Sequence, residues 1–175
     1  AFACYNFEND LEASLDAMVD KELNAVLLHE RGEYQVGCEV GERWNDMVID
    51  LAYTPAELMA RAIRDHWADC RVTLPELIRQ SDVASIHFYV GGLSGMRKNL
   101  FPGLLQAYEQ WTAKHDWQIL ADATAEGLTH WSSLGNELLD LHQRHGQAAA
   151  SQRVGSEFYN HYVAHAPAEP YAVLA

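Results

Sequence analysis

The chain has 175 residues, of which 49% are hydrophobic and 21% charged, and its formal net charge is -13. This composition is that of a folded globular protein and excludes an intrinsically disordered chain. The acidic excess argues against binding to nucleic acid or to anionic membranes, because both depend on cationic side chains. The length suits a single domain over residues 1–175, and no apolar run is long enough to cross a bilayer.

The chain has three cysteines, Cys4, Cys38 and Cys70, and they form no CxxC motif. So sparse and odd a number predicts no disulfide framework and fits a reducing compartment. The first residues lack the basic and apolar regions of an intact signal peptide. We therefore expect a soluble, cytoplasmic protein.

Apolar residues recur at three- and four-residue steps along most of the chain, which predicts helices. The first helix is expected from about Asn9 to the low forties, with a break near Gly32, Gly37 or Gly41. A second helix is predicted by the apolar residues Trp44, Met47, Val48 and Leu51.

The next two helices have clear start signals. Thr54, Pro55 and Glu57 provide an N-cap, a first-turn proline and a capping box, so a third helix is predicted from Pro55 to about Cys70. Thr73–Glu76 repeats this arrangement and predicts a short helix to about Gln80.

The second half of the chain contains one ambiguous segment and three further helices. Ser85–Val90 alternates apolar and polar residues and allows a short strand that ends at Gly91–Gly92. One helix is then predicted by the stripe Leu93, Met96, Leu100, Leu104, Tyr108 and Trp111. A long helix is expected from Trp117 to about His145, and a last one around Val154. The predicted fold class is all-α, a single-domain helical bundle of five to seven helices with at most one short strand pair.

The first predicted helix carries ionisable residues on the face that should be buried. With successive residues about 100° apart, Glu22, His29 and Glu33 fall on the stripe formed by Leu11, Leu15, Met18, Val36 and Val40. Burying such groups is unfavourable unless they are paired or bound to a metal ion.

The third predicted helix repeats this pattern, because His66 and Asp69 continue its apolar face. Carboxylates and imidazoles on facing helices are the usual ligands of iron, manganese or zinc in a helical bundle. We therefore predict a site for a divalent metal ion with the ligands Glu22, His29, Glu33, His66 and Asp69.

The segment His29–Glu33 resembles the first half of the HExxH helix of zinc proteases, with Glu33 in place of the second histidine. Glu30 is then the candidate general base. Two structural alternatives stay open. His29 could be a neutral core histidine bonded to a backbone carbonyl, and Glu22 or Glu33 could pair with Lys21, Arg61 or Arg64.

Two functions follow from these patterns. The first is a metal-binding helical bundle that could be an oxidative or hydrolytic enzyme. The second is a helical binding or accessory module, similar to an assembly chaperone, that holds a peptide or partner between its helices. Exposed aromatic residues would support the second, with Tyr5, Phe88, Tyr89 and Tyr171 as candidates. The expected partners are a small molecule, a protein or a second copy of the chain.

Overall fold

The computed structural model describes residues 5, 7–8 and 10–165, with the side chains of residues 158 and 160–165 left out. Within these residues the chain is all-α and has no strand, which confirms the predicted fold class. The helices are more numerous than the five to seven expected, because the segment that allowed a strand is helical and one predicted helix is divided in two. None of the described helices is long and apolar enough to cross a membrane.

Helix α1 (Leu11–Val40) is a 30-residue rod that begins and ends at recognisable caps. The side chain of Asp10 accepts a hydrogen bond from the amide of Ala13, which satisfies one of the free N–H groups of the first turn. The helix ends at Gly41, whose φ of 64° is a left-handed conformation that favours glycine. Of the three glycines considered as break points, Gly41 is therefore the one used. Helix α2 (Glu42–Asp50) follows at once.

Helix α3 (Pro55–Ala68) continues without a break through a π-helical segment, η2 (Asp69–Thr73), into α4 (Leu74–Arg79). Helix α3 begins at Pro55 as predicted, but the side chain of Thr54 does not cap it. Thr54 Oγ1 donates to the carbonyl of Leu51, and Glu57 accepts from the amide of Tyr53 at 2.9 Å. The π-helical segment accommodates Pro75, which lacks the N–H needed for a regular helical hydrogen bond.

The segment that allowed a strand lies instead in helix α5 (Val83–Gly92). Asp82 caps this helix by accepting from the amide of Ser85, and Ile86 and Val90 are buried one turn apart. The single helix predicted from Leu93 to Trp111 is two helices, α6 (Gly95–Leu100) and α7 (Pro102–Lys114). Pro102 disfavours helical backbone at the residue before it, so the chain turns at Phe101 although the apolar stripe continues.

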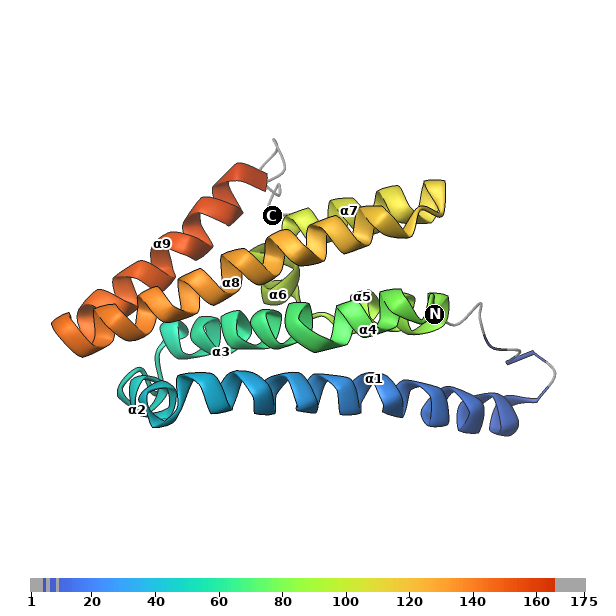
Figure 1. Cartoon of the computed structure of the whole chain (residues 1–175), viewed down its shortest axis with the longest axis horizontal. Helices are drawn as coiled ribbons and strands as arrows, with labels where there is room; N and C mark the ends of the chain where they lie inside the picture. Colours follow the sequence, from blue (N-terminus) through green and yellow to red (C-terminus); the bar gives the residue numbers. More distant parts are fainter. Residues whose placement is uncertain (1–4, 6, 9, 166–175) are drawn as a thin grey trace, which may run out of the picture.

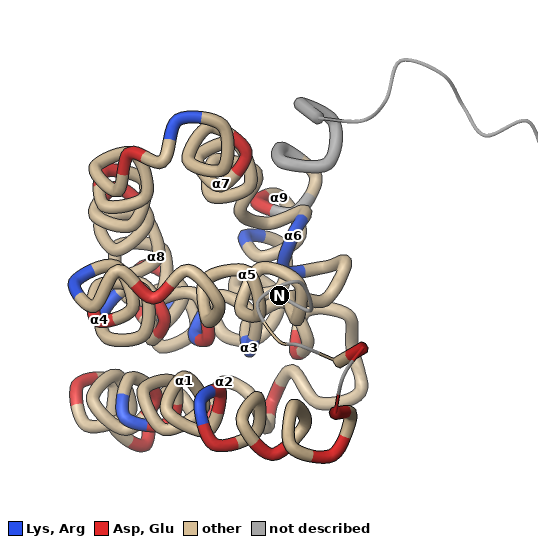
Figure 2. The backbone as a smooth tube through the Cα atoms, turned by 90° about the vertical axis from the view of Figure 1, so that its right-hand side faces the viewer, with Lys and Arg blue, Asp and Glu red and all other residues tan. Residues whose placement is uncertain are grey.

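The helices form three layers (Figures 1 and 2). Helices α1 and α2 form one outer layer, the α3–η2–α4 rod and α5 form the middle layer, and α7, α8 (Trp117–His145) and α9 (Gln147–His165) form the other outer layer. The core contains the fully buried indoles of Trp44, Trp67 and Trp131. Gly135 of α8 leaves the space that Trp67 occupies, because a Cβ there would lie 2.7 Å from its ring.

Among the described residues, helix α1 packs mainly against α3, η2 and α5, and also contacts α2. Its end near Leu11 runs past the neighbouring helices (Figure 1), and Leu11 and Leu15 are exposed. The predicted stripe is therefore correct from Met18 to Val40, where its members are buried or half-buried, and wrong at Leu11 and Leu15. The buried residues of α1 are Ser14, Glu22, Ala25, Leu28, Gly32, Val36 and Val40.

Candidate functional site

The site forms where α1 and α3 come into close contact at Gly32. A Cβ added at Gly32 would lie 2.5 Å from the carbonyl oxygen of Ala68, so only glycine allows this approach. His29 and Glu33 lie on α1 on either side of Gly32, whereas Asp65 and Asp69 lie near Ala68 on the facing rod. Each pair is spaced by four residues and so lies on one side of its helix. The close contact therefore brings four ionisable side chains together.

Asp69 is the buried centre of this arrangement. Its Oδ1 accepts from His29 Nδ1 at 2.7 Å and from Thr73 Oγ1 at 2.9 Å. Its Oδ2 accepts from Tyr89 Oη at 2.9 Å and from Arg97 Nη2. Burial alone would raise the pKa of Asp69, but the hydrogen bond from His29 and the charge of Arg97 outweigh it and hold this pKa below its ordinary value. Asp69 is thus a carboxylate that stays ionised in the protein interior.

The carboxylate of Asp69 fixes the orientation and tautomer of His29. An ionised carboxylate can only accept, so Nδ1 of His29 carries the hydrogen. The lone pair of the neutral ring then lies on Nε2, which faces Glu33 Oε1 at 3.8 Å. The hydrogen bond with Asp69 raises the pKa of His29, although burial opposes the shift. The result is an oriented imidazole with one free nitrogen, the arrangement found in histidines that bind metals or move protons.

Two further carboxyl groups lie beside that free nitrogen. One ligand atom each from His29, Glu33 and Asp65 lies within 4.8 Å of the others. Burial, chiefly, and the hydrogen-bonded carboxyl of Glu33 raise the pKa of Asp65 to about 6, against the opposing charge of Arg97. For Glu33 burial acts in the same direction, but Arg64 Nη2 donates to its Oε1 at 2.9 Å and keeps the pKa low. Asp65 therefore retains a proton at mildly acid pH, chiefly because burial disfavours its charged form.

Of the five predicted ligands, the structure brings His29, Glu33 and Asp69 together. Asp69 contacts the Nδ1 side of His29, away from the Nε2 that faces the other carboxyl groups. Asp65 was missed by the sequence analysis, although its spacing of four from Asp69 matches the spacing of His29 from Glu33. Glu33 also forms the ion pair with Arg64 that was one of the structural alternatives.

His66 and Glu22 lie outside this cluster. His66 is fully buried, stacks on Trp131 at 5.1 Å between ring centroids, and has its Nε2 3.0 Å from the carbonyl oxygen of Arg97. Burial lowers the pKa of His66 to about 3, so it is the neutral core histidine that was considered for His29. Glu22 is buried and accepts from Tyr5 Oη at 2.7 Å.

Glu30, the predicted general base, is exposed. It lies about 100° around α1 from His29, on the side that does not carry the cluster. The sequence analysis gave no role to Arg97 and considered Tyr89 only as an exposed aromatic residue, yet they reach Asp69 from 28 and 20 residues further along the chain.

The fold and this cluster define an all-helical protein with a buried carboxylate–histidine pair between two facing helices. Over residues 1–160 the chain matches the family described as "Family of unknown function (DUF6866) C-terminal domain", and it belongs to that family. Comparisons with curated proteins and with solved structures give no match.

Proposed function

We propose that this protein binds a divalent metal ion, with iron, manganese and zinc as candidates, through His29 Nε2 and one carboxylate oxygen each from Glu33 and Asp65. The observation that supports this proposal best is the anchoring of His29 Nδ1 by the buried Asp69. Histidines that bind metals usually donate their other ring N–H to a carboxylate or a carbonyl, which fixes the ring and increases its basicity.

The raised pKa of Asp65 supports the same proposal. Two carboxyl groups that share a proton when no cation is present can lose it to solvent when a divalent ion binds to them. The three ligand atoms lie within 4.8 Å of one another, whereas ligands of a tetrahedral zinc ion are about 3.4 Å apart, so small side-chain rotations are sufficient.

The metal ion would compete with Arg64 for Glu33, because Arg64 already pairs with that carboxylate. Three protein ligands leave a coordination position for water or a substrate, as in catalytic rather than structural sites. The number of protein ligands therefore favours a metal-dependent enzyme over a structural metal site.

Metal analysis of protein purified without chelator or affinity tag tests the proposal. We expect near-stoichiometric metal in the wild type and little in His29→Gln or Asp65→Asn. His145→Gln and Asp16→Asn are matched controls at exposed positions and should retain the metal. If the wild type contains no metal, and zinc, manganese or iron(II) added to it gives no rise in melting temperature, the proposal is wrong.

A second candidate function is supported by the outer face of α1. We define this face by the large exposed apolar side chains of the helix, which are Leu11, Leu15, Val19, Leu23, Val26, Leu27 and Tyr34. Five of them lie at successive four-residue steps. Such a continuous apolar stripe is unusual for the free surface of a protein.

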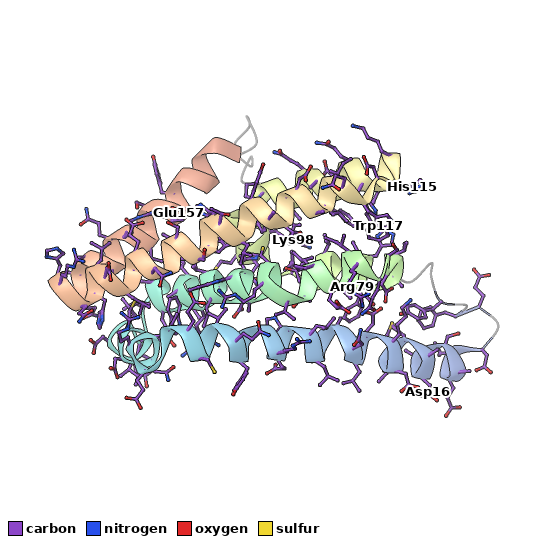
Figure 3. All side chains as sticks on the ribbon, viewed as in Figure 1. Asp16, Arg79, Lys98, His115, Trp117 and Glu157 are labelled. Carbon is purple, nitrogen blue, oxygen red and sulfur yellow. The ribbon has the colours of Figure 1, made fainter. Side chains whose placement is uncertain are left out.

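Acidic residues lie among these apolar side chains. Glu12, Asp16 and Glu30 fall on the same side of α1 and are exposed, and Asp16 points away from the bundle in Figure 3. This charge favours a partner helix that has an apolar stripe flanked by lysine and arginine. It weighs against a second copy of the chain, whose net charge is also -13.

The aromatic residues expected for a binding module give it less support. Tyr5 and Tyr89 are half-buried and donate to Glu22 and Asp69, respectively. Phe88 is 37% exposed. Tyr171 lies outside the described residues.

A synthetic amphipathic Leu/Lys peptide tests the binding-module function by fluorescence anisotropy. The wild type should bind this peptide more tightly than a Leu/Glu peptide of the same pattern, and the double variant Leu23→Ser/Leu27→Ser should lose binding. Leu58→Ser, at an exposed apolar position on α3, is the control. Equal binding by the double variant, or a dimer of wild type that the double variant abolishes, would overturn this choice of partner.

A further inference from the structure

A small pocket adjoins the buried end of the carboxylate–histidine pair. Its volume is about 190 Å³, and side chains from α1, η2, α5 and α6 line it. One part of the lining is apolar and includes Val26, Phe88 and Leu93. The other is polar and includes His29, Asp69 and Arg97. The pocket thus lies on the Asp69 side of the His29 ring, whereas Glu33 and Asp65 lie beside its Nε2.

Hydrogen-bonding capacity at the polar end is unevenly used. Each oxygen of Asp69 already accepts from two donors, so this carboxylate has no acceptor site left for a ligand N–H. Arg97 has five N–H donors and uses Nη2 for Asp69, while its buried Nε has no partner among the described residues. Arg97 is therefore the charged group that can still form hydrogen bonds with a ligand, and it can only donate them.

A ligand that complements this end must present acceptors, and a carboxylate matches the planar guanidinium best. The apolar side chains of Val26, Phe88 and Leu93 require a hydrocarbon part on the same molecule. The volume corresponds to about six water-sized groups, which limits the ligand to roughly six to eight non-hydrogen atoms.

We propose that this pocket binds a short-chain carboxylate, with its carboxylate at Arg97 and its chain between Val26, Phe88 and Leu93. The proposal goes beyond metal binding, because none of the contacts that support it involves Glu33 or Asp65. It can be tested in protein freed of metal, and its failure would leave the metal site untouched.

Titration calorimetry on the metal-free full chain tests the proposal with acetate, propanoate, butanoate, pentanoate and hexanoate. Affinity should rise by up to about fourfold for each added methylene, until the chain fills the pocket at about pentanoate or hexanoate. Pentanamide should bind at least tenfold more weakly than pentanoate, because it offers one acceptor and no charge. Inorganic phosphate should bind no better than acetate. An affinity that does not change with chain length, or pentanamide binding as tightly as pentanoate, would overturn the proposal.

Two variants test the two ends of the pocket. Arg97→Gln should lower pentanoate affinity at least tenfold. Because Arg97 also pairs with the buried Asp69, its loss can impair folding, and Phe88→Ser provides an independent test at a partly exposed position. Phe88→Ser should weaken pentanoate severalfold and leave acetate unchanged, with Leu58→Ser as the matched control. Unchanged pentanoate binding by Phe88→Ser would show that the chain lies elsewhere.

Discussion

The half-buried carboxyl group of Asp65 makes the stability of the protein depend on pH. Its pKa is raised from 3.8 to about 6, chiefly by burial. In the unfolded chain this carboxyl group titrates near its ordinary value. Between about pH 4 and pH 6, the folded protein therefore holds a proton that the unfolded chain has released. The contribution of Asp65 to stability is highest below this range, falls as the pH rises through it, and stays low at neutral pH.

Asp65→Asn removes the charge but keeps an N–H donor where the shared proton lies. A shift of about two pKa units corresponds to about 3 kcal/mol, and partial exposure of Asp65 reduces this to about 2 kcal/mol. The metal-free variant should therefore be more stable than the wild type by about 2 kcal/mol near pH 7.5, with little difference near pH 4.

Urea unfolding followed by circular dichroism, with chelator present at both pH values, measures this difference. Asp16→Asn, at an exposed position on α1, should leave the pH dependence unchanged. Zinc should stabilise the wild type near pH 7.5 and should stabilise Asp65→Asn much less. A variant that is no more stable than the wild type near pH 7.5, or that gains equally at both pH values, would refute the reasoning.

Three other predictions follow from described contacts. Gly32→Ala should destabilise the protein by about 1–3 kcal/mol, because its Cβ would meet the Ala68 carbonyl. Gly37→Ala, on the same helix, would meet no described atom within 4 Å and should stabilise the protein by up to about 1 kcal/mol. A thermal melt that ranks the two variants the other way would contradict the helix contact. In NMR titrations the ring of His66 should stay neutral down to about pH 4, whereas His29 should titrate above its ordinary pKa. In a Cys4→Ser background, a thiol reagent should modify the exposed Cys38 quickly. It should modify Cys70 only on unfolding, because this thiol is buried and burial raises its pKa. Rapid modification of two thiols in the folded protein would disagree with this packing.

The fold could be predicted from the sequence wherever a local signal coincided with the apolar period. Pro55 and the stripe of α8 placed their helices correctly. Phe101 shows the opposite case, because the apolar steps from Leu100 to Leu104 continue across a turn that Pro102 imposes. The alternation at Ser85–Val90 suggested a strand, but the cap provided by Asp82 was the stronger signal.

The site could be predicted in part for a related reason. Burial of an ionisable residue is visible in a helical pattern, but its partner is not. His29 and His66 both lie on apolar faces, yet one faces carboxyl groups and the other lies among aromatic rings. The partners Tyr89 and Arg97 come from α5 and α6, and only the tertiary fold brings them to Asp69.

The π-helical segment η2 joins α3 and α4 into one rod and changes the direction in which the side chains of α4 point relative to those of α3. Asp65 lies on α3 and Asp69 is the first residue of η2, and α4 follows η2. A π-helical turn holds about one residue more than an α-helical turn, so deletion of one residue such as Arg71 would remove the turn that accommodates Pro75. That deletion would rotate α4 by about 100° relative to the cluster. In the evolution of such a chain, insertions and deletions are therefore less tolerable within these five residues than in the connections between the helices.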